Sequence, residues 1–253
     1  MSVKEKMTTI ADAIRTKTGK SEPLTLEGMA QGVERVFAAG EQSEYDRFWD
    51  AYQQNGNRTA YRDGFGGKGW TENTFYPKYD IVPSSSSAAN LFFDADFGGD
   101  LAQRLSEQGV VLDTSKATIL EQMFSNNARL TRVGVIDISN AGTRTSGLFS
   151  FCAKLVTIDK LVVAANNAFV SIFQNCDALE NLTVEGAIGV SGLNVQWSTK
   201  LSKVSIISVV NALSETTSGL SVTLSKIAVN NVFTTAEWAT LAGTKSNWTI
   251  NLV

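Results

Sequence analysis

Apolar residues recur along the second half of the chain with a period of 22 to 25 residues. A column of leucines marks this period, at Leu130, Leu155, Leu179 and Leu201. The residues six positions before these leucines are also apolar: Phe124, Phe149, Phe173 and Val195. The residues three positions after them are apolar as well: Val133, Ile158, Leu182 and Val204. Three fully apolar columns would rarely arise by chance, so the pattern predicts a structural repeat.

A repeat of this length with an LxxL-like core is typical of a leucine-rich solenoid, in which each coil contributes one short strand. A single coil cannot bury its apolar face alone, so we expect the same inward side chains to stack from coil to coil. The predicted repeat core consists of the residues Phe124, Leu130, Phe149, Leu155, Phe173, Leu179 and Leu201.

Small residues that are polar or weakly polar lie three positions before the leucines: Asn127, Cys152, Cys176 and Ser198. In a solenoid, such residues satisfy backbone groups of the loops or fill tight corners. Two cysteines at this spacing therefore need no redox chemistry. A disulfide between adjacent coils stays open as the disfavoured alternative, because no export signal is visible.

Both ends of a solenoid need caps. Residues 89–113 would form an additional degenerate coil, with a short helix over residues 101–108 before a strand over 110–112. Near the C-terminus the pattern predicts a strand over 220–224, a helix over 235–242 and a final strand over 248–252. We expect this strand-helix-strand piece to cover the open end of the core.

The N-terminal residues carry a helical stripe rather than a repeat. Its apolar positions recur at intervals of 4, 3 and 4 residues, at Val3, Met7, Ile10 and Ile14. Such a narrow stripe suits a coiled-coil seam, but two heptads are too short for a free-standing coiled coil. These four residues therefore pack on the rest of the chain or form an assembly surface for a partner. Further helical faces follow over 26–37 and 45–52.

A glycine-rich stretch, "GFGGKGW", places Gly64, Gly66 and Gly69 at the spacing of a dinucleotide-binding motif. That motif needs a buried strand before it, a helix after it and an acidic residue about 20 positions later. The flanking residues show neither the strand nor the helix, and position 89, where the acidic residue would stand, is alanine. A Walker loop fails as well, because Lys68 is followed by glycine. We therefore interpret the stretch as a turn, and we expect no cofactor.

Charge and hydropathy narrow the classes of partner. Lys and Arg number 22 against 25 Asp and Glu, a net charge of −3, so we expect no nucleic acid ligand for this chain. The sequence has no apolar run long enough to cross a bilayer. The first twenty residues have no continuous apolar segment, so we expect no secretory signal and no membrane insertion.

Catalytic and metal chemistry has little support in the sequence. The chain has no histidine, which excludes histidine triads and most zinc sites, and its two cysteines are too few for a zinc site of their own. The cluster Asp94, Asp96 and Asp100 could serve a hydrolase, but its spacing fails as a calcium loop because Leu105 stands where a glutamate is needed. We interpret these carboxylates as solvated loop residues and expect no catalytic or metal residue.

The repeat "LFSFCAKLVTIDKL" with "IFQNCDALENLTV" resembles BspA-type leucine-rich repeats, whose core reads F-x-x-C-x-x-L-x-x-(I/L). The opening "IADAIRTKTGKSEPLTLEGMAQGV" is similar to the N-terminal segment of structural proteins from tailed phages and prophages of Firmicutes. "FGGKGW", "YPKYDIVPSSSSAANLF" and "LDTSKAT" resemble the middle of those proteins. The fourth repeat departs from the motif, with Val195 and Ser198 in place of Phe and Cys.

The expected fold class is therefore α+β, with an N-terminal helical region, a short BspA-like leucine-rich-repeat solenoid and the strand-helix-strand cap. The polar stretch "VPSSSSAAN" at residues 82–90 marks the expected boundary. It divides the chain into a helical and aromatic docking region, 1–82, and a solenoid domain with its cap, 83–253.

The resemblance implies a non-enzymatic virion protein of the tail, baseplate or fibre, made in the bacterial host cytoplasm. Its expected partners are other virion proteins and further copies of the chain. The alternative is an adhesin that binds a glycan or protein on the host-cell surface. In that case the ligand would bind either the solenoid face or the aromatic middle stretch. Four aromatic residues of that stretch would stack on sugar rings or, alternatively, plug the end of the core: Tyr61, Trp70, Tyr76 and Tyr79.

Overall fold

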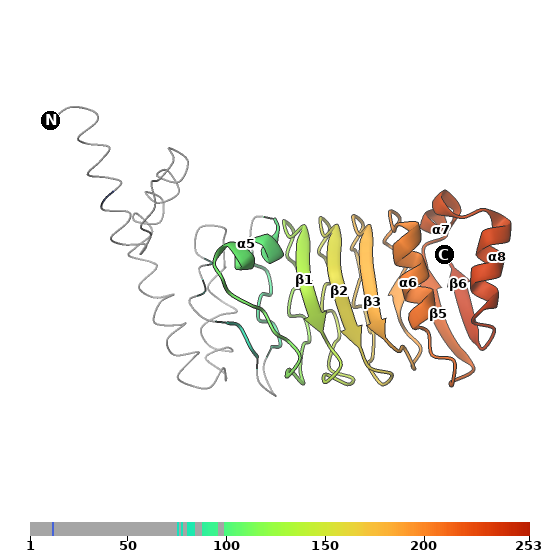
Figure 1. Ribbon diagram of the computed structural model, residues 1–253, viewed down its shortest axis with the longest axis horizontal. Coiled ribbons are helices and arrows are strands. Elements are labelled where there is room, and N and C mark those ends of the chain that lie inside the picture. The colour runs from blue at the N-terminus through green and yellow to red at the C-terminus, as the bar shows by residue number, and fades with distance from the viewer. Residues whose placement is uncertain (1–11, 13–74, 76, 78–79, 84–87, 96–98) are drawn as a thin grey trace, which may run out of the picture.

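The computed structural model describes residues 12, 75, 77, 80–83, 88–95 and 99–253. Within this part, helices and parallel sheets occur together, an α+β mixture. Figure 1 shows the strands side by side along the long axis, with most of the described helices near the C-terminus. The expected boundary between residues 82 and 83 is not tested by these residues and stays a prediction.

The first sheet consists of three parallel strands in sequence order: β1 (Arg132–Asp137), β2 (Thr157–Val163) and β3 (Asn181–Gly186). Ile158 of β2 pairs with Val133 on one side and with Leu182 on the other. These three residues form one of the apolar columns of the sequence, and all of them are buried. One circuit of the chain therefore separates each strand from the next, and successive circuits stack in register.

The opposite side of each circuit is a turn segment, and four of them stack: residues 88–95, 120–127, 145–152 and 169–176. A backbone ladder joins them, because the amide of a phenylalanine in one segment donates to a carbonyl in the next. The bonds are Phe92 N to Met123 O at 2.8 Å, Phe124 N to Leu148 O at 2.9 Å and Phe149 N to Ile172 O at 3.0 Å. Each segment thus fixes the position of its neighbour.

The backbone of every turn segment contains two left-handed residues, two positions before and two positions after its ladder phenylalanine. The first set is Asn90, Gln122, Gly147 and Ser171, with φ between 53° and 64°. The second set is Asp94, Asn126, Phe151 and Asn175, with φ between 55° and 63°. This repeated conformation returns the chain toward the next strand, and the sequence periodicity alone does not reveal it.

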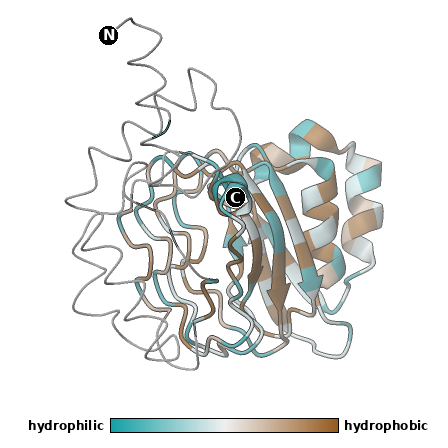
Figure 2. Cartoon of the chain, turned by 60° about the vertical axis from the view of Figure 1, so that its left-hand side comes forward, coloured by the Kyte–Doolittle hydropathy of each residue, from teal (hydrophilic) through white to brown (hydrophobic). Residues whose placement is uncertain are grey.

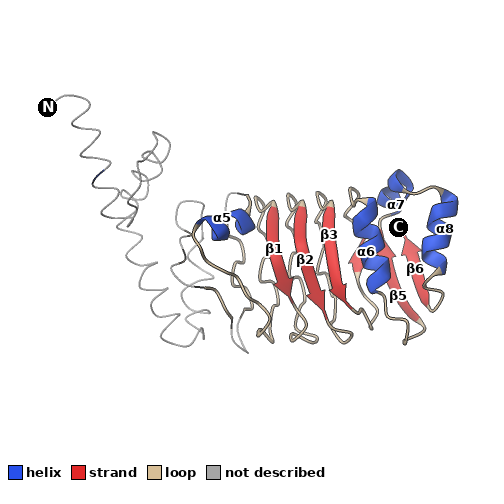
Figure 3. Ribbon diagram, viewed as in Figure 1, coloured by secondary structure: helices blue, strands red, loops and turns tan. Residues whose placement is uncertain are grey.

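The second sheet lies on the turn-segment side of the later circuits. Its parallel strands are β4 (Asn194–Val195), β5 (Leu220–Leu224) and β6 (Trp248–Leu252). Leu224 pairs with Val195 on one side and with Leu252 on the other. Helices connect the strands: α6 (Lys203–Ala212) precedes β5, and α7 (Lys226–Val232) and α8 (Thr235–Gly243) precede β6. Figure 3 shows α6, α7 and α8 beside β5 and β6 at the C-terminal end.

Helix α6 stands where the repeat predicts a fourth strand, so that part of the prediction is wrong. Ser202 caps the helix by accepting a hydrogen bond from the amide of Ser205, and the buried Ile206, Val209 and Val210 follow at helical spacing. Val204, which the repeat places in the core, is instead 75% exposed. The helical period of residues 203–212 overrides the period of the repeat at this point.

Serines of α6 cover the edge of β3, which has no neighbouring strand on that side. The hydroxyl of Ser205 accepts from the amide of Leu182 at 2.9 Å and donates to the carbonyl of Glu180 at 2.8 Å. The hydroxyl of Ser208 accepts from the amide of Val184 at 2.8 Å. These side chains satisfy the strand's outward backbone groups, which would otherwise form an unprotected sheet edge.

Most of the terminal elements match the sequence predictions, and one predicted strand does not. The helix expected over 101–108 coincides with α5 (Leu101–Glu107), and the strands expected over 220–224 and 248–252 coincide with β5 and β6. The strand expected over 110–112 is wrong, since Leu112 forms only a single bridge, with Ile81. The helix expected over 235–242 corresponds to α8, whereas the sequence pattern does not predict α7.

No helix in the described part of the chain combines the length and apolar character needed for a membrane span.

Candidate binding surface

A ladder of stacked phenylalanines forms the centre of the core. Ring centroids lie 5.4 Å apart for Phe92 and Phe124, 5.3 Å for Phe124 and Phe149, and 5.8 Å for Phe149 and Phe173. The last two pairs are nearly parallel, at 8° and 1°. Burial of each ring stabilises the fold by about 1.5–3 kcal/mol, and each aromatic pair adds about 0.5–1.5 kcal/mol. The ladder therefore fixes the stacking of the turn segments.

The structure places every residue of the predicted repeat core in the buried cluster: Phe124, Leu130, Phe149, Leu155, Phe173, Leu179 and Leu201. It extends the phenylalanine column to Phe92, which the sequence analysis did not include, and Phe75 packs edge-on against that ring at 5.5 Å. Phe92 does not follow from the repeat pattern, because its 32-residue separation from Phe124 exceeds the 22 to 25 residues of the repeat.

The small residues before the leucines bond the preceding circuit. The thiols of Cys152 and Cys176 donate to the carbonyls of Phe124 and Phe149, each at 3.0 Å. The side-chain amide of Asn127 donates to the carbonyl of Phe92. These bonds fit the role expected from the sequence. Both cysteines are free and buried.

Burial keeps these thiols protonated. It raises the pKa of Cys152 to about 12, and it raises the pKa of Cys176 well above its ordinary value, with a further contribution from the nearby Cys152. A protonated, buried thiol donates a hydrogen bond but is a poor nucleophile. The two cysteines are therefore structural hydrogen-bond donors at neutral pH.

Charged side chains link neighbouring circuits on the sheet side. Arg132 bonds both oxygens of Asp159, at 2.9 and 2.8 Å, and reaches Asp100 at 3.3 Å. The hydrogen bond with Asp159 is the main cause of the raised pKa of Arg132. The Arg132 side chain is 43% exposed, so solvent screening limits each pair to at most about 1 kcal/mol.

The aspartate cluster weighed as a hydrolase site has separate structural roles where the structure describes it. Asp100 caps α5 by accepting from the amide of Gln103 at 2.8 Å, in addition to its contact with Arg132. Asp94 is an exposed member of the left-handed column, and Asp96 lies outside the described residues. Among the described residues, no group of three or more Asp, Glu, Cys or His gathers as a metal site would require.

One residue of the turn segments breaks the pattern of its column. Asp94, Asn126 and Asn175 are residues that tolerate a left-handed backbone, whereas Phe151 adopts φ of 63° with a bulky aromatic side chain. Such strain costs about 1–3 kcal/mol at a non-glycine residue. The Phe151 side chain is also 45% exposed, so core burial does not account for its presence.

The backbone ladder holds Phe151 between two asparagines. Its amide donates to the carbonyl of Gln174 at 2.8 Å, and the amide of Asn126 donates to the carbonyl of Ser150 at 2.9 Å. Asn126 and Asn175 therefore occupy the equivalent positions on the adjacent circuits, about 4.8 Å away on either side, the spacing of neighbouring strands. The sequence analysis missed this site, although counting two positions beyond each ladder phenylalanine would have shown the odd residue.

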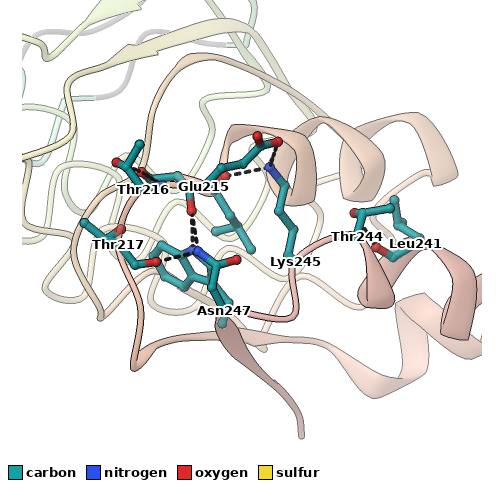
Figure 4. A network of polar contacts seen from close by, with 10 residues as sticks. Glu215, Thr216, Thr217, Leu241, Thr244, Lys245 and Asn247 are labelled. Carbon is teal, nitrogen blue, oxygen red and sulfur yellow. Dashed lines mark hydrogen bonds and ion pairs between the residues drawn. The ribbon is translucent and has the colours of Figure 1, made fainter.

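A second exposed feature is the loop 213–219, which the last part of the chain holds in place (Figure 4). Lys245 is 5% exposed, and its ammonium donates to the carbonyl of Leu213 at 2.7 Å and to the carboxylate of Glu215 at 3.2 Å. Asn247 and Trp248 both donate to the carbonyl of Ser214, at 2.9 and 2.8 Å. These bonds anchor the loop backbone and account for the buried lysine.

The other residues proposed from the sequence lie outside the part that the structure describes. They are the assembly candidates Val3, Met7, Ile10 and Ile14, and the stacking candidates Tyr61, Trp70, Tyr76 and Tyr79. Both sets stay predictions. No family model matches the chain, and no curated protein or solved structure is significantly similar to it.

Proposed function

We propose that the protein is a non-enzymatic structural component of a phage or prophage virion, belonging to the tail, baseplate or fibre. The sequence resemblance to such proteins in the N-terminal and middle stretches motivates this assignment. The observation that carries the display part of the proposal is the phenylalanine ladder, whose regular stacking makes a rigid support. We further propose that the stacked circuits are BspA-like leucine-rich repeats.

The geometry suits display because core and surface positions are separate. The ladder rings, the leucine column and the thiol hydrogen bonds hold the circuits together from inside. The second left-handed position of each turn segment carries a side chain that the core does not need. Such a position can vary without loss of the fold, as binding surfaces on rigid scaffolds require.

Assembly is assigned to the N-terminal stripe. In this proposal Val3, Met7, Ile10 and Ile14 contact other virion proteins or further copies of the chain, and the repeat domain is carried outward. Co-sedimentation of the full chain with purified tail particles tests the assignment. We expect binding that Ile10→Asp abolishes and that Lys4→Ala, a change beside the stripe, leaves intact. No association of the unmodified chain with particles would contradict the proposal.

The second candidate function is recognition of the host-cell surface by the same repeat domain. The observation in its favour is the exposed and strained Phe151, because an unfavourable residue kept at the surface is typical of a binding site. This function is compatible with a place in the virion. Pulldown of host cells by the full chain and by Ile10→Asp separates recognition from assembly, since in this proposal only assembly depends on the N-terminal stripe.

A further inference from the structure

We propose that Phe151 is the centre of a carbohydrate-binding site, in which its ring stacks on a pyranose and the side chains of Asn126 and Asn175 hydrogen-bond the hydroxyl groups of the sugar. The inference rests on the display role proposed above, but it does not depend on which particle or surface carries the protein.

The first argument is the conflict between residue type and backbone at position 151. The same conformation recurs on four circuits, and the residues at the other three are Asp94, Asn126 and Asn175. Asparagine and aspartate enter the left-handed region easily, because their short polar side chains bond locally. A phenylalanine at this position opposes local stability, so its presence is best explained by a contact outside the chain.

The second argument is the contrast between the two phenylalanines of one turn segment. Phe149 is fully buried in the ladder, whereas Phe151, two residues later, is 45% exposed. The backbone from Phe149 to Phe151 is fixed, because the amides of both residues bond the next circuit, at 3.0 and 2.8 Å. The exposed ring therefore sits on a preorganised backbone, which reduces the entropy lost on binding.

The third argument is the chemistry of the flanks. A pyranose presents an apolar face of C–H groups and a rim of hydroxyl groups that donate and accept hydrogen bonds. An aromatic ring matches the face, and an asparagine amide matches the rim because it also donates and accepts. Asn126 and Asn175 are both at least partly accessible to solvent, one circuit to either side of the ring.

Other ligand classes fit these residues less well. A stable protein interface needs about 800 Å² from each partner, so a protein ligand would also have to contact the residues around Phe151. The exposed residues that follow Phe151 are Ala153, with a small side chain, and Lys154, with a charged one, and neither extends an apolar contact surface. A nucleobase would also stack on the ring, but the chain carries a net charge of −3 and Asp94 belongs to the same column. A neutral sugar meets neither obstacle.

The test compares the full-length protein with Phe151→Asn, which restores the residue type of the column. The probes are immobilised oligosaccharides of β-linked glucose, galactose and N-acetylglucosamine, and binding is measured as a dissociation constant. We expect binding to at least one probe, a loss of tenfold or more in Phe151→Asn, and retention in Phe151→Trp. The control is Val170→Thr, which changes another exposed apolar side chain, 60% exposed, and should leave binding unchanged.

A thermal unfolding measurement on the same variants separates a binding role from a structural one. If the ring serves a ligand, Phe151→Asn relieves backbone strain and its Tm is equal to or above that of the unmodified protein. A lower Tm in Phe151→Asn, equal binding by that variant, or no binding to any probe would each overturn the inference. Failure of the chain to associate with tail particles would contradict the virion assignment alone.

Discussion

The circuits through β1, β2 and β3 differ from the C-terminal circuits in how many residues each one uses. One column of inward side chains runs through both regions: Phe124, Phe149 and Phe173 in the first, and Val195, Leu224 and Leu252 in the second. Successive members are 25 and 24 residues apart in the first region, but 29 and 28 apart in the second.

The helices account for this difference. A strand advances about 3.3 Å per residue and an α-helix about 1.5 Å, so a helix needs more residues to cross the same side of the molecule. The 29-residue circuit contains α6, and the 28-residue circuit contains α7 and α8; the 32-residue interval from Phe92 to Phe124 also contains a helix, α5. Figure 2 shows hydrophobic and hydrophilic residues alternating on the helices at this end, as in helices with one face on the core. The two regions thus continue one core with different elements.

The largest expected effect tests whether aromatic stacking makes the first region the more tightly packed. Phe149→Ala removes a ring that has partners on both sides and should lower the free energy of unfolding by about 3–5 kcal/mol. Val195→Ala in the second region should cost only about 1.5 kcal/mol, at about 0.8 kcal/mol per buried methylene-sized group. Urea unfolding of both variants measures the difference in the free energy of unfolding. Equal losses in the two variants would show that the first region is not the more tightly packed.

The next effect concerns how closely the circuits approach one another. A Cβ at Gly186, where φ is 105°, would clash with the carbonyl oxygen of Val163. Gly186→Ala should therefore destabilise by about 3 kcal/mol or more, from overpacking added to strain. Gly219, with φ of 74° in the second region, has nothing within 4 Å of such a Cβ. Gly219→Ala should cost about 1 kcal/mol, and a similar cost for both variants in thermal unfolding would contradict the close approach.

A smaller effect is expected at the junction between the two regions. Ser205→Ala leaves the amide of Leu182 without its hydroxyl partner and should cost about 1–3 kcal/mol. Ser208→Ala should cost less, because Ser208 is only partly buried. Hydrogen exchange should become faster at Leu182 in the first variant and at Val184 in the second. Unchanged exchange at these amides would show that the serines do not protect the sheet edge.

The smallest effect is the pH dependence of the helical region. The hydrogen bond from Lys203, together with those from Thr234, lowers the pKa of Glu237 from 4.5 to about 2. Because the folded-state pKa is depressed, the stabilisation by Glu237 is complete above pH 4.5 and is lost as the pH falls toward 2. Glu237→Gln should therefore flatten the loss of stability over this range.

The matched variant in the first region is Glu121→Gln, because the hydrogen bond with Arg144 lowers the pKa of Glu121 too. Both effects should be small and should weaken in high salt, since these groups are largely solvated. Acid titration of thermal stability measures both variants. An unchanged pH profile in Glu237→Gln would show that the contacts of Glu237 do not stabilise the fold.

Several elements followed from the sequence because their signals are local. The strands of the first sheet lie at the apolar column of Val133, Ile158 and Leu182, and β5 and β6 match their predicted bounds. Helix α6 was missed because Leu201 and Val204 continue the repeat pattern into a segment whose own apolar spacing is helical. The period of the repeat and the helical period overlap in this segment, and the prediction from the repeat is the wrong one.

The binding surface was harder to predict than the core. The stacking candidates rest on aromatic residue type alone, which carries no information on backbone conformation. Counting along the repeat marks Phe151 as the odd residue of its column, but its left-handed backbone and its exposure are evident only in the structure. Neither property can be read from the residue type alone.

The sequence by itself determined which side chains face the interior in the circuits through β1, β2 and β3, because burial of apolar surface is strong and its period is visible there along the chain. The tertiary structure alone decided which element fills each side of a circuit, which backbone positions are left-handed and which aromatic ring is exposed. These properties depend on contacts between circuits, such as the bonds of Ser205 with β3 and of Phe151 with the next turn segment. Contacts between residues more than twenty positions apart leave little local signal in a single sequence.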